Sequence, residues 1–222
     1  MSAISLKDKA YAMIKDKIIR CEYLPGEILV ESEIIEAVGA SRTPIREALN
    51  KLEQERLVHI VPKRGVFVAE LTVATVCEVH DVRELVEPHF VQTFGPLVPA
   101  SRIDALIIEL DELDKNPDSS PERYYHFDNE LHMLFAKYAN NSYLQMMMDQ
   151  IYGQNNRIRI LTGDTSRKRL DESQQEHRMI LEPLRERDFT AAAQAMRQHL
   201  QIARDAALNA ITKSSSLRFG LD

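Results

Sequence analysis

The sequence predicts a mainly α-helical protein in two parts: a small helical domain carrying one β-hairpin, and then an all-α antiparallel helical bundle. Apolar residues recur at helical spacing through most of the 222 residues. Two β-rich runs lie between residues 57 and 69, on either side of a turn that ends in glycine. From residue 72 onward, only short clusters of Pro, Gly and Asn interrupt the helical pattern. The predicted domains are therefore 1–71 and 72–213, followed by a tail at 214–222.

The first domain is predicted to contain a helix-turn-helix. Spacing and turn signals place a helix over 6–20, an extended piece over 28–30, a helix from Ser32 to Gly39, and a helix from Pro44 to about Arg56. Ser32 is expected to cap the second helix, and Ser41 or Thr43 the third, because their hydroxyls can satisfy the first backbone amides. Pro44 falls where a missing amide hydrogen costs nothing. Two helices joined by a short turn containing Gly39 make a helix-turn-helix.

A β-hairpin is expected directly after the third helix. Residues 57–61 and 66–69 are rich in β-formers, and the four residues between them end in Gly65. A helix-turn-helix followed by a hairpin is a winged helix-turn-helix. Lys63, Arg64 and Gly65 would form the tip of the wing, where glycine allows the backbone to approach a minor groove.

The charge distribution favours nucleic acid as the partner of this domain. The whole chain carries a net charge of −6, but the first domain is balanced, with eleven basic and eleven acidic residues. Residues 40–65 hold six basic and only three acidic residues. Arg42 and Arg46 are expected to point outward from the third helix. An exposed helix start with arginines around it suits phosphates and base edges.

The second domain is predicted to contain six helices, over residues 72–94, 100–115, 121–139, 142–162, 166–187 and 189–212. The breaks between them are short and contain Pro, Gly or Asn, at residues 95–99, 116–121, 140–141 and 163–164. Short connections between helices are typical of an antiparallel bundle.

Four polar side chains interrupt the apolar stripes of this bundle: Asp128, His132, His177 and His199. Asp128 and His132 lie four residues apart, so they project from one helix face one turn apart. Burying all four without partners would be costly, whereas a divalent cation would satisfy them together. We predict one divalent transition metal per chain, with zinc favoured and nickel or manganese as alternatives. The competing interpretation is that each histidine is separately hydrogen-bonded in the core.

Arg83 interrupts the apolar stripe of the first bundle helix. Glu87 lies four residues later, so a buried ion pair, or an arginine at a domain boundary, is one interpretation. The functional interpretation is an anion receptor, because a guanidinium holds a carboxylate in two parallel hydrogen bonds. Tyr152, Asn155 and Arg159 lie roughly one turn apart on the fourth bundle helix and are predicted to join this effector pocket. Asn156 and Arg157 compete with them for the inward side.

Composition excludes several other classes of protein. No run approaches the roughly 18–20 apolar residues that a membrane span requires, and the N-terminus lacks a signal-peptide pattern. Cys21 and Cys77 are far apart and in no metal spacing. We therefore expect a cytoplasmic protein with reduced thiols and no membrane partner.

These motifs resemble the GntR family of bacterial transcription regulators, in its FadR-like branch with the all-helical FCD ligand-binding domain. In the first domain the resemblance rests on Leu24-Pro-Gly-Glu, on Ser41-Arg-Thr-Pro-Ile-Arg-Glu-Ala-Leu and on Gly65. In the second it rests on Arg83-x-x-x-Glu87-Pro88, Asp128-x-x-x-His132, Glu176-His177 and His199-Leu200. It covers nearly the whole chain.

The resemblance implies a homodimer on a pseudo-palindromic DNA operator. Arg42 and Arg46 would read bases, Ser41 and Thr43 would contact phosphate, and Gly65 would enter the minor groove. It also implies that Asp128, His132, His177 and His199 bind the metal and that Arg83 contacts a small carboxylate. One departure is Ser32, which stands between Glu31 and Glu33 where many members have a basic residue. Another is Leu131, where an aromatic residue is common.

The predicted function is a DNA-binding transcription regulator, a repressor, whose operator affinity responds to a small organic acid at the metal-containing pocket. The first alternative is a metal-dependent enzyme with a DNA-binding appendage, since an Asp/His₃ metal can activate water. No separate general base is evident, because Glu176 is expected to point away from the stripe, so we do not expect an enzyme. The second alternative is a regulator whose metal is purely structural.

Overall fold

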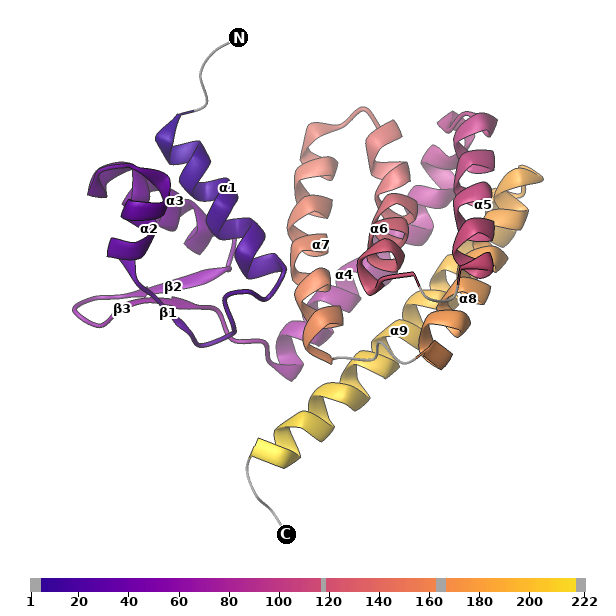
Figure 1. The fold of residues 1–222 in the computed structure, drawn as a ribbon. Helices are drawn as coiled ribbons and strands as arrows, with labels where there is room; N and C mark the ends of the chain where they lie inside the picture. Colours follow the sequence, from indigo (N-terminus) through magenta and orange to yellow (C-terminus); the bar gives the residue numbers. More distant parts are fainter. Residues whose placement is uncertain (1–4, 117–118, 163–166, 219–222) are drawn as a thin grey trace. The chain divides into compact units, whose positions relative to one another are not determined.

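The computed structural model describes residues 5–116, 119–162 and 167–218 of the chain. The chain divides into two compact units, Met1–Thr72 and Val73–Asp222 (Figure 1). Each unit buries its own cluster of apolar side chains, and each is considered by itself. Among the helices described, none is both long enough and apolar enough to cross a membrane.

The N-terminal unit is a winged helix-turn-helix, as predicted. Its elements are α1 (Leu6–Ile19), β1 (Ile28–Leu29), α2 (Glu31–Val38), α3 (Arg42–Gln54), β2 (Val58–Val61) and β3 (Gly65–Val68). The strands pair antiparallel in the order β1-β3-β2. Ile14, Ile45 and Leu49 are among the buried side chains that join the three helices to the sheet. Gly39 ends α2 in the left-handed conformation, at φ 69°.

The starts of α2 and α3 differ from the predictions. Ser32 does not cap α2, because the helix already begins at Glu31 and Val30 occupies the cap position without a side-chain bond. Glu31 and Glu33, in the first turn of α2, place negative charge at the positive end of the helix dipole instead. Helix α3 begins at Arg42, two residues earlier than predicted, and Ser41 stands at its cap position without a side-chain capping bond. Pro44 still lies within the first turn, where no amide partner is lost.

The wing is one residue tighter than predicted. Gly65 is the first residue of β3 and pairs with Val61, so the turn comprises residues 62–64. Gly65 has φ 118°, a conformation that favours glycine, and Lys63 has φ 64° at the tip. The backbone amide of Arg64 closes the turn by donating to the Val61 carbonyl at 3.0 Å.

In the part of the chain described, the C-terminal unit contains the six α-helices that the sequence predicts and one short 3₁₀ turn. They are α4 (Val73–Phe94), η1 (Gly95–Leu97), α5 (Ala100–Lys115), α6 (Pro121–Tyr138), α7 (Ser142–Thr162), α8 (Arg167–Arg185) and α9 (Phe189–Arg218). Helix α9 packs along α4 and α8 (Figure 1). It continues to Arg218, so the tail predicted from residue 214 is wrong as far as 218, because no Gly or Pro there stops the helix. Residues 219–222 and the predicted turns at 117–118 and 163–164 lie outside the described residues.

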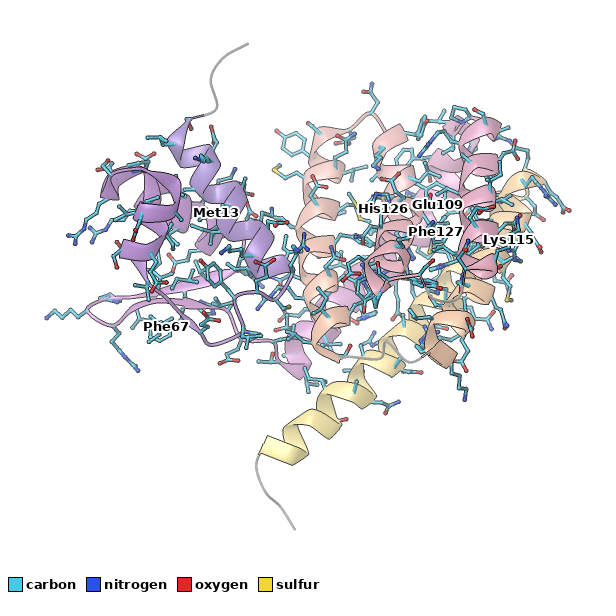
Figure 2. The ribbon with its side chains drawn as sticks, in the orientation of Figure 1. Met13, Phe67, Glu109, Lys115, His126 and Phe127 are labelled. Atoms are coloured by element: carbon cyan, nitrogen blue, oxygen red, sulfur yellow. The ribbon has the colours of Figure 1, made fainter. Side chains whose placement is uncertain are left out.

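The inward stripes of the bundle face a shared core. On α6, the adjacent residues His126 and Phe127 diverge: Phe127 is 1% exposed, whereas the side chain of His126 lies 3.8 Å from Glu109 of α5 at the surface (Figure 2). Phe127 therefore belongs to the buried face of α6, and His126 to its exposed face.

Candidate functional site

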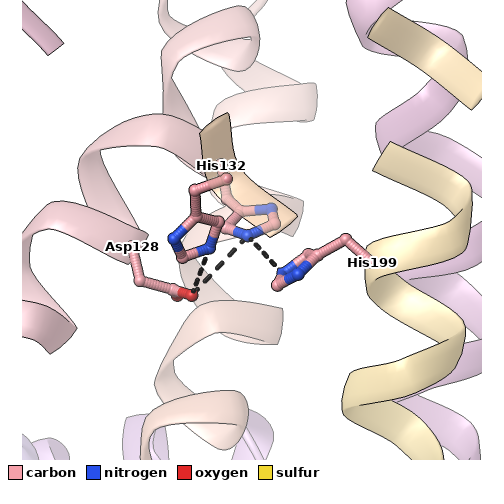
Figure 3. Close-up of side chains that lie close together, drawn as sticks. Asp128, His132 and His199 are labelled. Carbon is pink, nitrogen blue, oxygen red and sulfur yellow. Dashed lines mark hydrogen bonds and ion pairs between the residues drawn. The ribbon is translucent and has the colours of Figure 1, made fainter. Parts of the chain in front are cut away.

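The four predicted metal ligands come together from three helices. Asp128 and His132 belong to α6, His177 to α8 and His199 to α9. One potential ligand atom from each lies within 4.8 Å of the other three, and all three histidines are buried. The Nε2 atoms of His132 and His199 are 3.2 Å apart, and Oδ1 of Asp128 lies 3.3 Å from Nε2 of His177. Figure 3 shows Asp128, His132 and His199 pointing toward one another.

Two of the histidines contact a glutamate through Nδ1, the ring nitrogen that faces away from the cluster. Nδ1 of His132 lies 2.5 Å from Oε2 of Glu87, and Nδ1 of His199 lies 2.6 Å from Oε2 of Glu176. Burial alone would raise the pKa of Glu87, but Arg83 and His132 lower it to about 2. Burial likewise opposes ionisation of Glu176, but His199 and Arg169 lower its pKa. Both carboxylates are therefore acceptors, and both Nδ1 atoms must donate.

This hydrogen bonding fixes the tautomers and leaves the inner nitrogens as acceptors. When both rings are neutral and Nδ1 carries the proton, the Nε2 lone pairs of His132 and His199 face each other at 3.2 Å without a hydrogen bond between them. Burial lowers the pKa of His199 to about 3, so protonation of this ring does not relieve the conflict near neutral pH. Nε2 of His177 is buried, and Oδ1 of Asp128, 3.3 Å away, is an anion beside it rather than a partner with normal hydrogen-bond geometry. A divalent cation would engage these lone pairs, so the donor set fits a metal.

The fourth ligand candidate, Asp128, is also paired with an arginine. Arg159 of α7 contacts Oδ2 of Asp128 and donates to Oδ1 of Asn129 at 2.9 Å. Burial would raise the pKa of Asp128, but Arg159 and His132 hold it well below its usual value. Asp128 is therefore ionised and can serve as an anionic ligand near neutral pH.

A cavity of about 110 Å³ adjoins the cluster within the C-terminal unit. All three residues predicted to bind an effector line it: Arg83, Asn155 and Arg159. Arg83 is nevertheless engaged within the protein at each of its three nitrogens. It donates at 2.8 Å from Nε to Glu87, from Nη1 to Oδ1 of Asn155 and from Nη2 to the hydroxyl of Tyr152. The buried ion pair considered from the sequence is therefore present.

Sequence reasoning missed three functional candidates, and helical spacing carried a signal for two of them, His80 and Gln174. His80 and Gln174 line the cavity, and both stand three residues before a predicted site residue on an inward stripe. Nδ1 of His80 and both polar side-chain atoms of Gln174 are buried without partners. Glu176 was expected to point away, but it contacts His199, because a long side chain can reach around the helix from a flanking position.

The predicted DNA contacts form an exposed set on the N-terminal unit. The seven exposed residues are Ser41, Arg42, Thr43, Arg46, Lys63, Arg64 and Gly65. Arg46 is restrained by Glu31, with 3.6 Å between Nε and Oε2, and its side chain is 66% exposed. The guanidinium of Arg64 lies 5.9 Å from the centre of the Phe67 ring. Helix α3 thus buries its apolar face and offers its cationic face to solvent.

Comparison with known proteins assigns both units. The model of the gntR family of bacterial regulatory proteins matches residues 6–68, and that of the FCD domain matches residues 78–202. An HTH-type transcriptional regulator of Streptomyces ambofaciens is 30% identical over 200 residues, which cover 88% of this chain and 82% of the relative. The HTH-type transcriptional repressor RspR of Escherichia coli K12 is 24% identical over 88% of this chain and 86% of its own.

The fold comparison agrees with the family matches. A GntR transcriptional regulator from Rhodococcus sp. RHA1 superposes with a TM-score of 0.77 at 24% identity, covering 93% of this chain and 99% of the other. These proteins are transcription regulators and not enzymes, in agreement with the sequence prediction. The chain belongs to the GntR family of bacterial regulatory proteins and is a transcription regulator that joins a DNA-binding helix-turn-helix to an FCD domain.

Proposed function

We propose that a small carboxylate metabolite controls the DNA affinity of this regulator by binding in the FCD domain beside a divalent metal. One observation carries the proposal: four converging ligand atoms adjoin a cavity whose walls hold buried polar atoms without partners. Buried polar atoms are normally hydrogen-bonded, so unpartnered atoms around a cavity indicate a polar ligand.

The metal would be held by Asp128, His132, His177 and His199, one ion per chain. Three imidazoles and one carboxylate favour zinc, with nickel or manganese as alternatives. When bound, such an ion supplies a Lewis-acidic position for a carboxylate oxygen. The histidines would bind it without losing a proton from the ring, because Nδ1 of His132 and His199 already donates to a glutamate.

The effector would be a small organic acid. A cavity of about 110 Å³ is well below the ~300–1,000 Å³ of pockets for drug-sized ligands, which argues against a long acyl group. Arg159 is the cation proposed to contact the carboxylate, and it would do so through Nε, which is buried without a partner. Its Nη atoms already contact Asp128, Asn129 and Asn156. Asn155 would donate from Nδ2, which also lacks a partner, and His80 and Gln174 would contact polar groups on the rest of the effector. In this arrangement Arg83 donates to Oδ1 of Asn155 and would orient its amide toward the effector.

On the DNA side, we propose a homodimer acting in the cytoplasm on a pseudo-palindromic operator as a repressor. Arg42 and Arg46 would read base edges in the major groove, as side chains at the start of a recognition helix do. Ser41 and Thr43 would contact phosphates there. The basic wing tip, Lys63, Arg64 and Gly65, would follow the backbone into the minor groove. The effector can change operator affinity only as far as its own affinities for the two conformations of the dimer differ.

The test is operator binding, measured by fluorescence anisotropy on duplexes from the promoter region of the chain's own gene. Candidate acids are added singly to zinc-loaded and to chelator-treated protein. At least one acid is expected to change the dissociation constant about 5- to 150-fold, and only with zinc present. If no acid in a broad panel changes operator binding by the zinc-loaded protein, the effector role is refuted and a purely structural metal is favoured.

A further inference from the structure

We infer that two arginine–glutamate pairs, Arg83–Glu87 and Arg169–Glu176, position the imidazoles of His132 and His199 for metal binding. In this assignment Arg83 acts through Glu87 on the metal centre, and its predicted role as the effector's anion receptor passes to Arg159. The inference rests on the metal site proposed above, but it concerns residues that are not themselves ligands.

The first pair is a closed, buried network between three helices. Both oxygens of Glu87 on α4 are engaged. Oε1 accepts from Nε of Arg83 at 2.8 Å and from the Tyr152 hydroxyl of α7 at 2.9 Å, and Oε2 faces Nδ1 of His132 on α6. Arg83 and Glu87 are 2% and 1% exposed. The guanidinium therefore fixes the carboxylate, and the carboxylate fixes the rotation of the ring.

The second pair repeats this arrangement on α8. Nη1 of Arg169 lies 2.8 Å from Oε1 of Glu176, and Nη2 lies 3.4 Å from Oε2. Oε2 of Glu176 in turn faces Nδ1 of His199 on α9, at 2.6 Å. Arg169 lines the cavity. The side chains of Arg169 and Glu176 are 15% and 13% exposed.

A role in packing alone does not account for these two pairs. A buried ion pair contributes little net stability, because the desolvation of both charges offsets their attraction. Both carboxylates, however, end on the same nitrogen, Nδ1, of two different ligand histidines. That contact leaves Nε2 unprotonated, directs it into the cluster and raises its basicity, which is how outer hydrogen bonds prepare a histidine for a metal.

The inference is tested by the affinity of the full-length protein for Zn²⁺, measured in competition with a chromophoric chelator. Two variants are used: Glu176→Gln, and the double variant Arg83→Met with Glu87→Gln, which removes both buried charges together and so strands neither. Each is expected to raise the dissociation constant for Zn²⁺ about 10- to 100-fold, the usual loss when an outer partner of a ligand histidine is removed. The visible spectrum of the Co²⁺-loaded protein should also change, because the rotated ring alters the coordination geometry.

The matched control is Glu84→Gln. Glu84 lies on α4 three residues before Glu87 and pairs with Arg204, 3.3 Å away on α9, rather than with a ligand histidine. Its dissociation constant for Zn²⁺ should equal that of the wild type. The melting temperature of each metal-free variant separates positioning from packing, since a packing role lowers that temperature and leaves Zn²⁺ affinity unchanged.

The possible outcomes separate the two proposals. Folded variants that bind Zn²⁺ with wild-type affinity and an unchanged Co²⁺ spectrum would overturn the positioning role and leave the metal site standing. If Glu176→Gln alone folds, its affinity decides the question for His199. A wild-type protein that binds neither ion would instead refute the metal site, and the positioning role with it.

Discussion

Replacing His177 by alanine should abolish the stabilisation that a divalent metal gives to this protein. A ligand present at 100 times its dissociation constant stabilises the folded state by about 2.7 kcal/mol. For a domain of this size, each kcal/mol shifts the melting temperature by roughly 2–4 °C, so added Zn²⁺ should raise that of the wild type by about 5–11 °C. In His177→Ala this rise should disappear, because the ring is 3% exposed and its Nε2 faces the other ligand atoms.

The metal-free variant is expected to lose much less stability than the metal supplies. Truncation removes the packing of the His177 ring against Phe127, whose ring centre lies 5.5 Å away. It also removes a buried nitrogen without a partner, which on its own destabilises by about 1–3 kcal/mol. These two effects have opposite signs, so the melting temperatures of the two chelator-treated proteins should be similar.

The assay is thermal unfolding with Zn²⁺ or with chelator, combined with elemental analysis of protein purified without chelator. The wild type should carry close to one divalent ion per chain. His126→Ala is the matched control, because His126 lies on the same helix as His132 but its side chain is 70% exposed at the surface. The metal site would be contradicted if Zn²⁺ still raised the melting temperature of His177→Ala, or if the wild type carried no metal. The four residues would then be interpreted as core side chains that are hydrogen-bonded separately.

Three further predictions concern DNA recognition and acid stability. Arg46→Ala should weaken operator binding by about 1–3 kcal/mol and relax base specificity. Lys63→Ala should weaken binding to all sequences alike and reduce the slope of log affinity against log salt concentration by about 1. Anisotropy titrations at several salt concentrations distinguish the two effects. Glu31→Gln should strengthen operator binding about 2- to 5-fold in the same assay, because it frees Arg46 from a surface ion pair worth at most about 1 kcal/mol; unchanged affinity would remove Arg46 from the interface. Burial lowers the pKa of His80 from 6.5 to about 3, so the unfolded chain binds more protons between these values and stability is lost as pH falls through them. His80→Phe should reduce that loss in urea unfolding of metal-free protein at pH 7 and pH 5, and an equal loss in both proteins would contradict the assignment.

The fold and the inward position of the ligand residues were predictable because helical periodicity fixes which face of a helix is buried. Asp128 and His132 fall in register with the apolar line of α6, and the structure buries that line. The same logic identified Arg83 as an interruption. Periodicity does not say which helix will stand opposite a face, so the sequence left open whether Arg83 meets a ligand or another side chain.

The partners of Arg83 show where sequence reasoning ends. Tyr152 and Asn155 lie 69 and 72 residues further along the chain, and only the packing of α4 against α7 brings them within 2.8 Å. Glu176 presents a different limit. It stands beside the stripe of His177, and the reach of a flexible side chain, which spacing cannot express, brings it to His199 on another helix.

Asn155 connects the proposed effector pocket to the proposed metal centre. Its Oδ1 accepts from Arg83, which holds Glu87 and through it His132, while its Nδ2 is buried at the cavity without a partner. An effector that accepts a hydrogen bond from Nδ2 would order the same amide that orders Arg83. Binding at either site then stabilises the side-chain arrangement that the other requires, without any change in the backbone. By linkage, the factor by which the effector tightens Zn²⁺ binding must equal the factor by which Zn²⁺ tightens effector binding. Because a shared amide carries part of this coupling, Asn155→Ala should reduce both factors together.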